Sequence, residues 1–216
     1  MRNIFVSSLI LLALLVSSCH QQTGNQIFNG RNLDGWNFVL EEEEKNSALS
    51  REVFRVLPGG IISIGGMPYG YMYTQETFEN FTLELEWRWP SGESNSGIFV
   101  KIEDTGNPFP TSVEVQLWAG NAGDFVLLAG ADIAEFVVPE GEERPAFPIA
   151  PKRHPSNEKP AGEWNHAKVH VLNGVITVHI NGLLQNVGTS SVRRGHIGLQ
   201  SEGKEIQFRN IRFETH

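Results

Sequence analysis

The sequence predicts an all-β fold, a jelly-roll sandwich of two antiparallel sheets. Helical periodicity is scarce, whereas short runs rich in β-branched and aromatic residues are frequent and are separated by Gly, Pro, Asn and Ser. Many short, evenly spaced strands with such turns are typical of sandwiches and jelly rolls. The predicted strands are 54–57, 61–64, 81–89, 97–102, 113–118, 125–128, 167–172, 175–180, 196–200 and 206–213.

Two Asn-Gly pairs predict tight hairpins near the C-terminal end. Asn173-Gly174 and Asn181-Gly182 each separate two apolar runs, and they lie eight residues apart. A two-residue hairpin turn needs positive φ at both positions, which Asn and Gly adopt at little cost. We therefore expect a three-stranded meander over residues 164–187.

The N-terminus has the pattern of a secretion signal. Arg2 precedes an almost entirely apolar run over 4–16, which is too short to span a bilayer comfortably and ends in small residues. Val16-Ser17-Ser18-Cys19 resembles the bacterial lipobox, and Cys19 is the only cysteine. We expect a signal peptide over 1–18, a lipidated Cys19 with a tether to residue 26, and one β-sandwich domain over 27–214. The alternative is an ordinary signal peptide with an incidental cysteine.

The anchor and the charge limit the partners. Residues 20–26 contain no acidic run, which favours a lipid-anchored protein on the periplasmic face of the outer membrane over surface display. The chain carries 17 Lys and Arg against 25 Asp and Glu, a net charge of −8. Nucleic-acid binding needs a basic surface, so a nucleic-acid partner is excluded. The expected membrane contact is through the lipid anchor only.

Three predicted strands carry polar residues on one face. If 81–89, 97–102 and 113–118 are neighbours in one sheet, aromatic platforms and charged groups share one surface, as a sugar-binding groove needs. The alternative is a solvent-facing sheet with cross-strand ion pairs. Clustered aromatic residues on the polar face favour a binding surface. The residues of this face are Glu84, Glu86, Arg88, Phe99, Lys101, Glu114, Gln116 and Trp118.

Seven segments of the chain occur in the order of one known family. They are FNGRNLDGW (28–36), YGYMYTQETFENFTLELEWRW (69–89), NSGIFVK (95–101), EVQLWAGNAGDF (114–125), KPAGEWN (159–165), INGLLQN (180–186) and GHIGLQSEGKEIQFRNIRF (195–213). Together they resemble the 3-keto-disaccharide hydrolases over residues 26 to 214. The resemblance implies a concanavalin-A-like fold, two curved antiparallel sheets with a carbohydrate site on the concave one.

The resemblance implies that a glycoside already oxidised to a ketone at C3 is the substrate. The ketone acidifies the C2 proton, so a base removes it, the C1 substituent leaves by β-elimination, and water then adds. This route needs a base near C2 and an electrophile for the enolate. The resemblance implies that Glu114 is the general base or a metal or sugar ligand. It also implies that Lys101 and Arg88 are cations that stabilise the enolate, and that Gln116 and Gln200 are amides that bind the sugar. Further candidates are Asp124 and Trp118 as an acid beside the site and a stacking platform.

The sequence defines the roles of the histidines and the need for a metal less clearly. His154 lies in the proline-rich segment 139–162, where a lid could carry it over the groove, and His196 shares a face with Gln200. Both are candidates for acid–base, metal or structural roles. No sequence spacing typical of a metal site occurs, so no cofactor is implied with certainty, and a divalent metal would have to be assembled across strands.

Two other functions stay open. The same fold serves non-catalytic glycan-binding proteins, so a binding lipoprotein is the main alternative to an enzyme. A buried titratable group in the groove would favour the enzyme. An ordinary retaining glycosidase is disfavoured, because Gln116 stands two residues after Glu114, where a second carboxylate is expected, and an amide cannot ionise.

Overall fold

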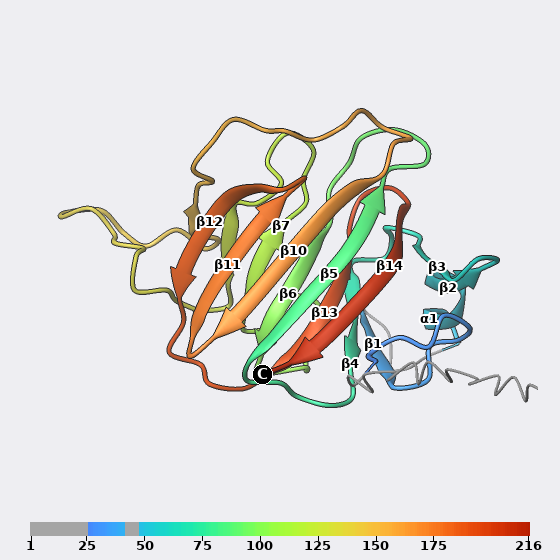
Figure 1. The fold of residues 1–216 in the computed structure, drawn as a ribbon. Helices are drawn as coiled ribbons and strands as arrows, with labels where there is room; N and C mark the ends of the chain where they lie inside the picture. The colour runs from blue at the N-terminus through green and yellow to red at the C-terminus, as the bar shows by residue number, and fades with distance from the viewer. Residues whose placement is uncertain (1–25, 42–47) are drawn as a thin grey trace, which may run out of the picture.

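A computed structural model describes residues 26–41 and 48–216, which form two seven-stranded antiparallel sheets packed face to face (Figure 1). In spatial order the β7 sheet contains β1 (Trp36–Leu40), β4 (Gly70–Thr74), β13 (His196–Ser201), β6 (Gly97–Ile102), β7 (Ser112–Gln116), β8 (Phe125–Leu128) and β9 (Ile149–Ala150). The β5 sheet contains β12 (Leu183–Thr189), β11 (Val175–Ile180), β10 (Asn165–Leu172), β5 (Phe81–Arg88), β14 (Ile206–Thr215), β3 (Ile61–Ile64) and β2 (Phe54–Leu57).

The predicted all-β sandwich is confirmed, and each of the ten predicted runs forms a strand. The only helix of the described residues is a single turn, α1 (Ser50–Val53). Strands β1, β4 and β9 were not predicted, and β12 was predicted only as the third strand of the meander. All five residues of β4 are buried, so this strand lacks the alternation that marks a half-buried strand. The described residues contain no helix long and apolar enough to cross a membrane.

The predicted meander is confirmed as β10, β11 and β12. Strand β10 pairs with β11 from Ala167–Ile180 to Leu172–Val175, and β11 pairs with β12. Both turns have the expected backbone, with φ of 50° and 85° at Asn173 and Gly174 and of 48° and 82° at Asn181 and Gly182. These turns fix the order of three strands of the β5 sheet.

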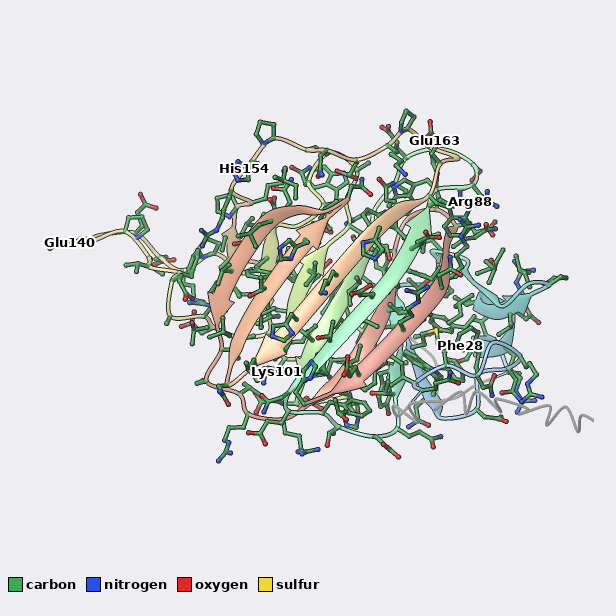
Figure 2. All side chains as sticks on the ribbon, in the orientation of Figure 1. Phe28, Arg88, Lys101, Glu140, His154 and Glu163 are labelled. Atoms are coloured by element: carbon green, nitrogen blue, oxygen red, sulfur yellow. The ribbon has the colours of Figure 1, made fainter. Side chains whose placement is uncertain are left out.

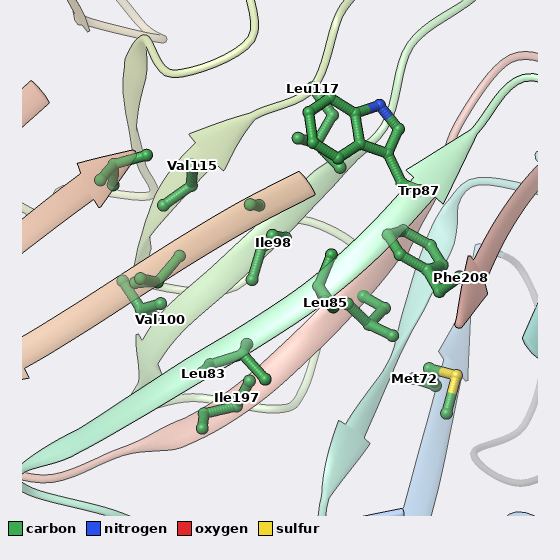
Figure 3. Packing of buried hydrophobic residues seen from close by; sticks show 14 of the residues in the cluster. Met72, Leu83, Leu85, Trp87, Ile98, Val100, Val115, Leu117, Ile197 and Phe208 are labelled. Atoms are coloured by element: carbon green, nitrogen blue, oxygen red, sulfur yellow. The ribbon is translucent and has the colours of Figure 1, made fainter. Parts of the chain in front are cut away.

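The core lies between the two sheets and is built from the alternating apolar residues of facing strands (Figure 3). Leu83, Leu85 and Trp87 of β5 point into it, and all three are at most 1% exposed. Val115 on β7 and Leu117 just after it enter from the other sheet. Burial of apolar surface contributes about 25 cal/mol per Å². The inward faces predicted for these strands are therefore confirmed, and the polar faces point outward.

The predicted neighbourhood of β5, β6 and β7 is wrong. Strand β6 pairs with β7 and β13, whereas β5 pairs with β10 and β14 in the opposite sheet. Alternation shows which face of a strand is buried, but both sheets of a sandwich bury one face and expose the other. The polar side chains of β5 therefore lie on the far side of the molecule from those of β7.

Candidate active site

A pocket opens on the outer face of the β7 sheet, over β6, β7, β8 and β13. Its volume is about 210 Å³, which is below the ~300–1,000 Å³ of pockets that enclose drug-sized ligands and suits part of a ligand, such as one ring. The lining side chains divide into a polar group and an apolar group. They are Asn95, Glu114, Gln116, Gln200 and Glu202, and Phe109, Val126, Leu128 and Phe147.

Glu114 is the buried carboxyl group of this pocket. It lies in the middle of β7, between the core residues Val113 and Val115, so its side chain points to the outer face. It leans over Gly97 of the neighbouring strand, where a β-carbon would collide with its carboxyl group. Glu114 is only 3% exposed, and its Oε1 has no hydrogen-bond partner among the described residues. Burial, with a smaller contribution from the charge of Glu202, raises the pKa of Glu114 well above its ordinary value.

A second carboxyl group, Glu202, lies just after β13 and faces the same pocket. The Nε2 of Gln200 donates to its Oε2 at 2.8 Å, and Asn95 hydrogen-bonds it as well. Burial raises the pKa of Glu202 above its usual range, although these hydrogen bonds oppose the shift. The Oδ1 of Asn95 and the Oε1 of Gln200 are buried without a hydrogen-bond partner in the described part of the chain. Such orphaned acceptors are rare in proteins and suit the hydroxyl groups of a bound ligand.

Aromatic residues continue this face beyond the pocket. Gly198 pairs with both Tyr73 and Phe99, and Phe99 pairs with Glu114, so these residues form one row across the sheet. The rings of Tyr71 and Phe99 lie 5.4 Å apart. The phenol oxygen of Tyr71 is buried without a partner in the described residues, and burial raises its pKa. Phe99 lies on this outer face, but its ring is fully buried among its neighbours and does not line the pocket.

Gln116, Gln200 and His196 lie on this face as predicted. Gln116 and Gln200 line the pocket, and the Oε1 of Gln116 accepts from the backbone of Leu117 and Trp118 at 3.1 Å each. His196 lies further along β13, outside the pocket lining, where its Nδ1 is 2.7 Å from the carbonyl oxygen of Thr74. Trp118 is 51% exposed in the turn after β7 and does not line the pocket.

Glu86 and Arg88 do not belong to this site. They lie on the outer face of β5, in the other sheet. Glu86 accepts a hydrogen bond of 2.6 Å from the Nε of Arg209. Arg88 donates from Nε to the Oε1 of Gln207 at 3.0 Å, and its guanidinium lies 4.6 Å from the ring centre of Trp164. The predictions of a catalytic Arg88 and a substrate-binding Glu86 are therefore corrected, because the opposite sheet separates both side chains from the pocket. Glu84 on the same face is paired with Lys168 at 3.0 Å.

Lys101 also faces away from the pocket. It has φ of 59° and lies where the register between β6 and β13 shifts, so a β-bulge breaks the alternation that would align it with Phe99. Its ammonium group donates to the carbonyl oxygens of Val192 and Arg193 at 2.7 and 2.8 Å. Burial lowers its pKa. The prediction that Lys101 meets the substrate is wrong, and Figure 2 shows Lys101 and Arg88 at different ends of the molecule.

His154 and Asp124 are held by the proline-rich segment. The backbone N–H groups of Arg153 and His154 donate to Gln185 of β12, and the His154 side chain is exposed (Figure 2). This part of the segment is tied to the β5 sheet, so the predicted lid that would carry His154 over the groove is wrong. The carboxylate of Asp124 accepts from the backbone N–H of Lys152 at 2.8 Å and pairs with its ammonium group at 3.5 Å. Asp124 lies outside the pocket lining and anchors the segment.

Sequence reasoning missed Glu202 and Asn95. The signal for Glu202 was present, because residues 196, 198, 200 and 202 alternate onto one face, and Gln200 had been placed there. Asn95 precedes β6 in an irregular segment, where no periodicity applies. No group of three or more His, Cys, Asp or Glu side chains suited to a metal occurs in residues 26–41 and 48–216. The polar half of the pocket consists of two carboxyl groups and three amides.

Comparisons with known proteins agree with this fold. A 3-keto-disaccharide hydrolase of Bacteroides thetaiotaomicron is 24% identical over an alignment of 233 residues. The alignment covers 88% of this chain and 77% of that protein. A solved structure of a candidate glycosyl hydrolase from Parabacteroides distasonis is 23% identical with a TM-score of 0.62, covering 88% of this chain and 98% of that one. A Bacillus licheniformis beta-glucanase has a TM-score of 0.55 at 10% identity, covering 88% and 97%. These structures confirm the jelly-roll fold.

One further comparison identifies the family. Residues 24–214, nearly the whole chain, match the family described as the 3-keto-alpha-glucoside-1,2-lyase-like domain. The match spans both sheets and every residue of the pocket. The chain belongs to the 3-keto-alpha-glucoside-1,2-lyase-like domain family.

Proposed function

We propose that this protein cleaves the glycosidic bond of 3-keto-glycosides, with Glu114 as the base that removes the C2 proton. Its family makes the chain an enzyme of the glycoside hydrolase type. One observation carries the residue assignment: a carboxyl group that is 3% exposed, with an oxygen that has no hydrogen-bond partner among the described residues, lines a pocket that suits one sugar ring. A carboxyl group whose pKa is raised by burial is a stronger base when it ionises, and a base tuned toward neutral pH is efficient in proton transfer.

In the first half of the reaction the C2–H bond breaks and its proton goes to Glu114. The electron pair forms an enolate with the C3 ketone, and the enolate then expels the C1 oxygen to leave a double bond between C1 and C2. Glu202, protonated beforehand, gives its proton to the departing oxygen. Burial raises the pKa of both carboxyl groups, so the pair can hold the one proton that this step requires. The pair thus has one base and one acid, the division of roles that two carboxyl groups adopt in other enzymes.

In the second half, water adds to C1 of the unsaturated ketone. Glu202, now ionised, takes a proton from the water, and Glu114 returns its proton to C2. Both carboxyl groups recover their starting states, and the net change is the addition of one water across the glycosidic bond. If product leaves before water adds, the same residues perform a 1,2-elimination only.

The developing enolate charge must be met by neutral donors. No Lys or Arg lines the pocket in the described part of the chain, since Arg88 and Lys101 lie elsewhere. Gln116 has its Oε1 engaged by backbone N–H groups, which leaves its Nε2 as a donor. A carboxylic acid kept neutral by burial can also donate a hydrogen bond to an enolate. These donors act in a buried site, where hydrogen bonds to charge are strong.

The other functions considered make different demands on the site. A binding protein has no need for two buried carboxyl groups with raised pKa values, so the burial of Glu114 supports an enzyme. An ordinary glycosidase does use two carboxyl groups, and Glu202 supplies the second one that the sequence of β7 lacks. The ketone requirement therefore has to be tested directly.

The test compares a 3-keto-glycoside with its unoxidised parent, with release of the aglycone as the readout. We expect release from the ketone only, and Glu114→Gln should lower kcat by about 10²–10⁴-fold, the usual contribution of a general base. Glu86→Gln is the matched control, because it removes a glutamate carboxylate from the other sheet. Equal release from both substrates would refute ketone-dependent elimination. Unchanged turnover by the Glu114 variant would remove it from the chemistry.

We also propose that the chain is a lipoprotein anchored through Cys19 at the periplasmic face of the outer membrane. The segment in question, residues 1–25, lies outside the described residues, so the proposal is supported by its sequence pattern alone. Palmitate labelling in a bacterial host should mark the wild-type protein and not Cys19→Ser. Equal labelling of both proteins, or a Cys19→Ser variant that stays with the membrane fraction, would contradict the anchor.

A further inference from the structure

We propose that the pocket has a separate subsite for an apolar, ring-bearing leaving group, so that glycosides of aromatic alcohols are preferred over disaccharides. This inference rests on the proposed function, because it assigns the two ends of the same substrate. It concerns the wall formed by Phe109, Val126, Leu128 and Phe147, here called the apolar wall.

Glu114 stands at the boundary between the two halves of the pocket. On one side lies Gly97 of β6, and beyond it Gln200 and Glu202 supply polar groups. On the other side Glu114 pairs with Val126 of β8, and Val126 pairs with Ile149 of the edge strand β9. Paired residues share a face, so polarity changes from amide and carboxyl groups to hydrocarbon at Glu114. With C2 at Glu114 and the C1 oxygen turned toward Glu202, the sugar occupies the polar half of the pocket, and the group beyond that oxygen extends to the hydrocarbon half.

The two phenylalanines of the apolar wall belong to a connected group of aromatic rings. The rings of Phe109 and Phe147 meet edge to face with centres 6.0 Å apart, and Tyr69 meets Phe109 in the same way at 6.0 Å. Phe147 is 53% exposed, so its ring is open to a ligand, and Ile149, which is 49% exposed, extends the apolar surface beyond the pocket lining. Exposed apolar side chains are ordinary when isolated, but a contiguous group beside a pocket marks a binding surface.

The chemistry of the wall selects the leaving group. Its four side chains offer no hydrogen-bond donor or acceptor, so a sugar unit seated there would lose water from its hydroxyl groups without replacement. Each polar group left unsatisfied on burial carries a free-energy penalty. An aromatic ring gains from burial of its own apolar surface and from edge contacts with the phenylalanine rings. A benzyl-type alcohol fits these requirements better than a second sugar.

The experiment compares four substrates with similar alkoxide chemistry: the 3-keto forms of benzyl glucoside, cyclohexylmethyl glucoside, methyl glucoside and a glucose disaccharide. We expect kcat/KM for the two ring-bearing glucosides to exceed that for the disaccharide by at least about tenfold. Phe147→Ala should lower kcat/KM about tenfold for the benzyl substrate and less than twofold for the methyl substrate. Val137→Ala is the control, since Val137 is 77% exposed and does not line the pocket, and it should change neither value.

A binding measurement separates this inference from the proposed function. Calorimetric titration with unoxidised benzyl glucoside and methyl glucoside needs no turnover. We expect tighter binding of the benzyl compound, and Phe147→Ala should abolish the difference. Equal affinity for the two glucosides, or a uniform loss on all substrates in the Phe147 variant, would overturn the subsite. If oxidised and unoxidised glycosides were cleaved equally but the benzyl compound still bound more tightly, the proposed reaction would be overturned and the subsite would stand.

Discussion

Strands β5 and β7 have the same alternating pattern but different polar faces. On β5 each glutamate has a basic partner, since Glu84 pairs with Lys168 at 3.0 Å and Glu86 with Arg209 at 2.6 Å. On β7 the Oε1 of Glu114 has no partner among the described residues, although the side chain is almost fully buried. A satisfied and half-exposed carboxylate is structural, whereas a buried and unsatisfied one carries a penalty that function explains.

The same contrast appears in the pKa values. Burial acts to raise the pKa of Glu86, but the hydrogen bond and charge of Arg209 outweigh it, and its pKa is lowered. The hydrogen bond from Lys168 lowers the pKa of Glu84. Burial without a cation raises the pKa of Glu114 and of Glu202. The cations that satisfy the β5 glutamates are Lys168 and Arg209. The two cations that the sequence analysis assigned to the site, Arg88 and Lys101, instead bind Gln207 and two backbone carbonyl groups.

After Glu114, the largest loss of activity is expected when Glu202, the second carboxyl group of the pocket, is changed. Glu202→Gln removes the proposed proton donor to the leaving group, so we expect kcat to fall by about 10²-fold or more. The loss should be smaller for substrates whose leaving group needs no protonation, such as a nitrophenolate. Glu205→Gln is the control, because its carboxylate accepts from Ser63 in the β5 sheet at 2.7 Å. An equal loss on both classes of leaving group would exclude the acid role.

The next effect tests the close contact between β6 and β7. A β-carbon at Gly97 would collide with the carboxyl group of Glu114, so Gly97→Ala should displace that group and lower kcat by about tenfold or more. Overpacking of this kind also destabilises a protein by about 1–3 kcal/mol. Gly65→Ala is the matched control, since its β-carbon would meet only ordinary contacts at 3.8–3.9 Å. Full activity of the Gly97 variant would show that Glu114 tolerates another position.

The fold was more predictable from the sequence than the site, for a physical reason. Alternation and Asn-Gly turns are local, and they predicted ten strands and the meander. The assignment of β5 to the opposite sheet depends on long-range pairing, which no local pattern encodes. One β-bulge at Lys101 was enough to turn a predicted site residue away from the pocket. Glu202 was within reach, because its alternation with Gln200 could have been extended by one step.

A smaller effect concerns stability against pH. The folded-state pKa of Glu114 is raised above its unfolded value near 4.5, so ionisation is disfavoured in the fold. Stability therefore falls as pH rises from about 4.5 through the folded pKa. The pKa of Glu202, the other carboxyl group of the pocket, is also raised, so Glu202 acts in the same direction. In urea unfolding, Glu114→Gln should gain stability relative to wild type as pH rises above about 4.5. A difference in unfolding free energy between the variant and wild type that stays constant from pH 4 to 8 would contradict the raised pKa.

The smallest effect is expected on the β5 face, at the pair of Glu84 and Lys168. The two side chains are 29% and 44% exposed, so solvent screens their attraction, and a double-mutant cycle should give about 0.2–1 kcal/mol. The coupling should shrink further in 1 M salt, where charges are screened over about 3 Å. Turnover of the Glu84→Gln variant should match wild type, because the side chain faces away from the pocket. A loss of activity there would mean that the two sheets do not divide stability and chemistry between them as their polar faces indicate.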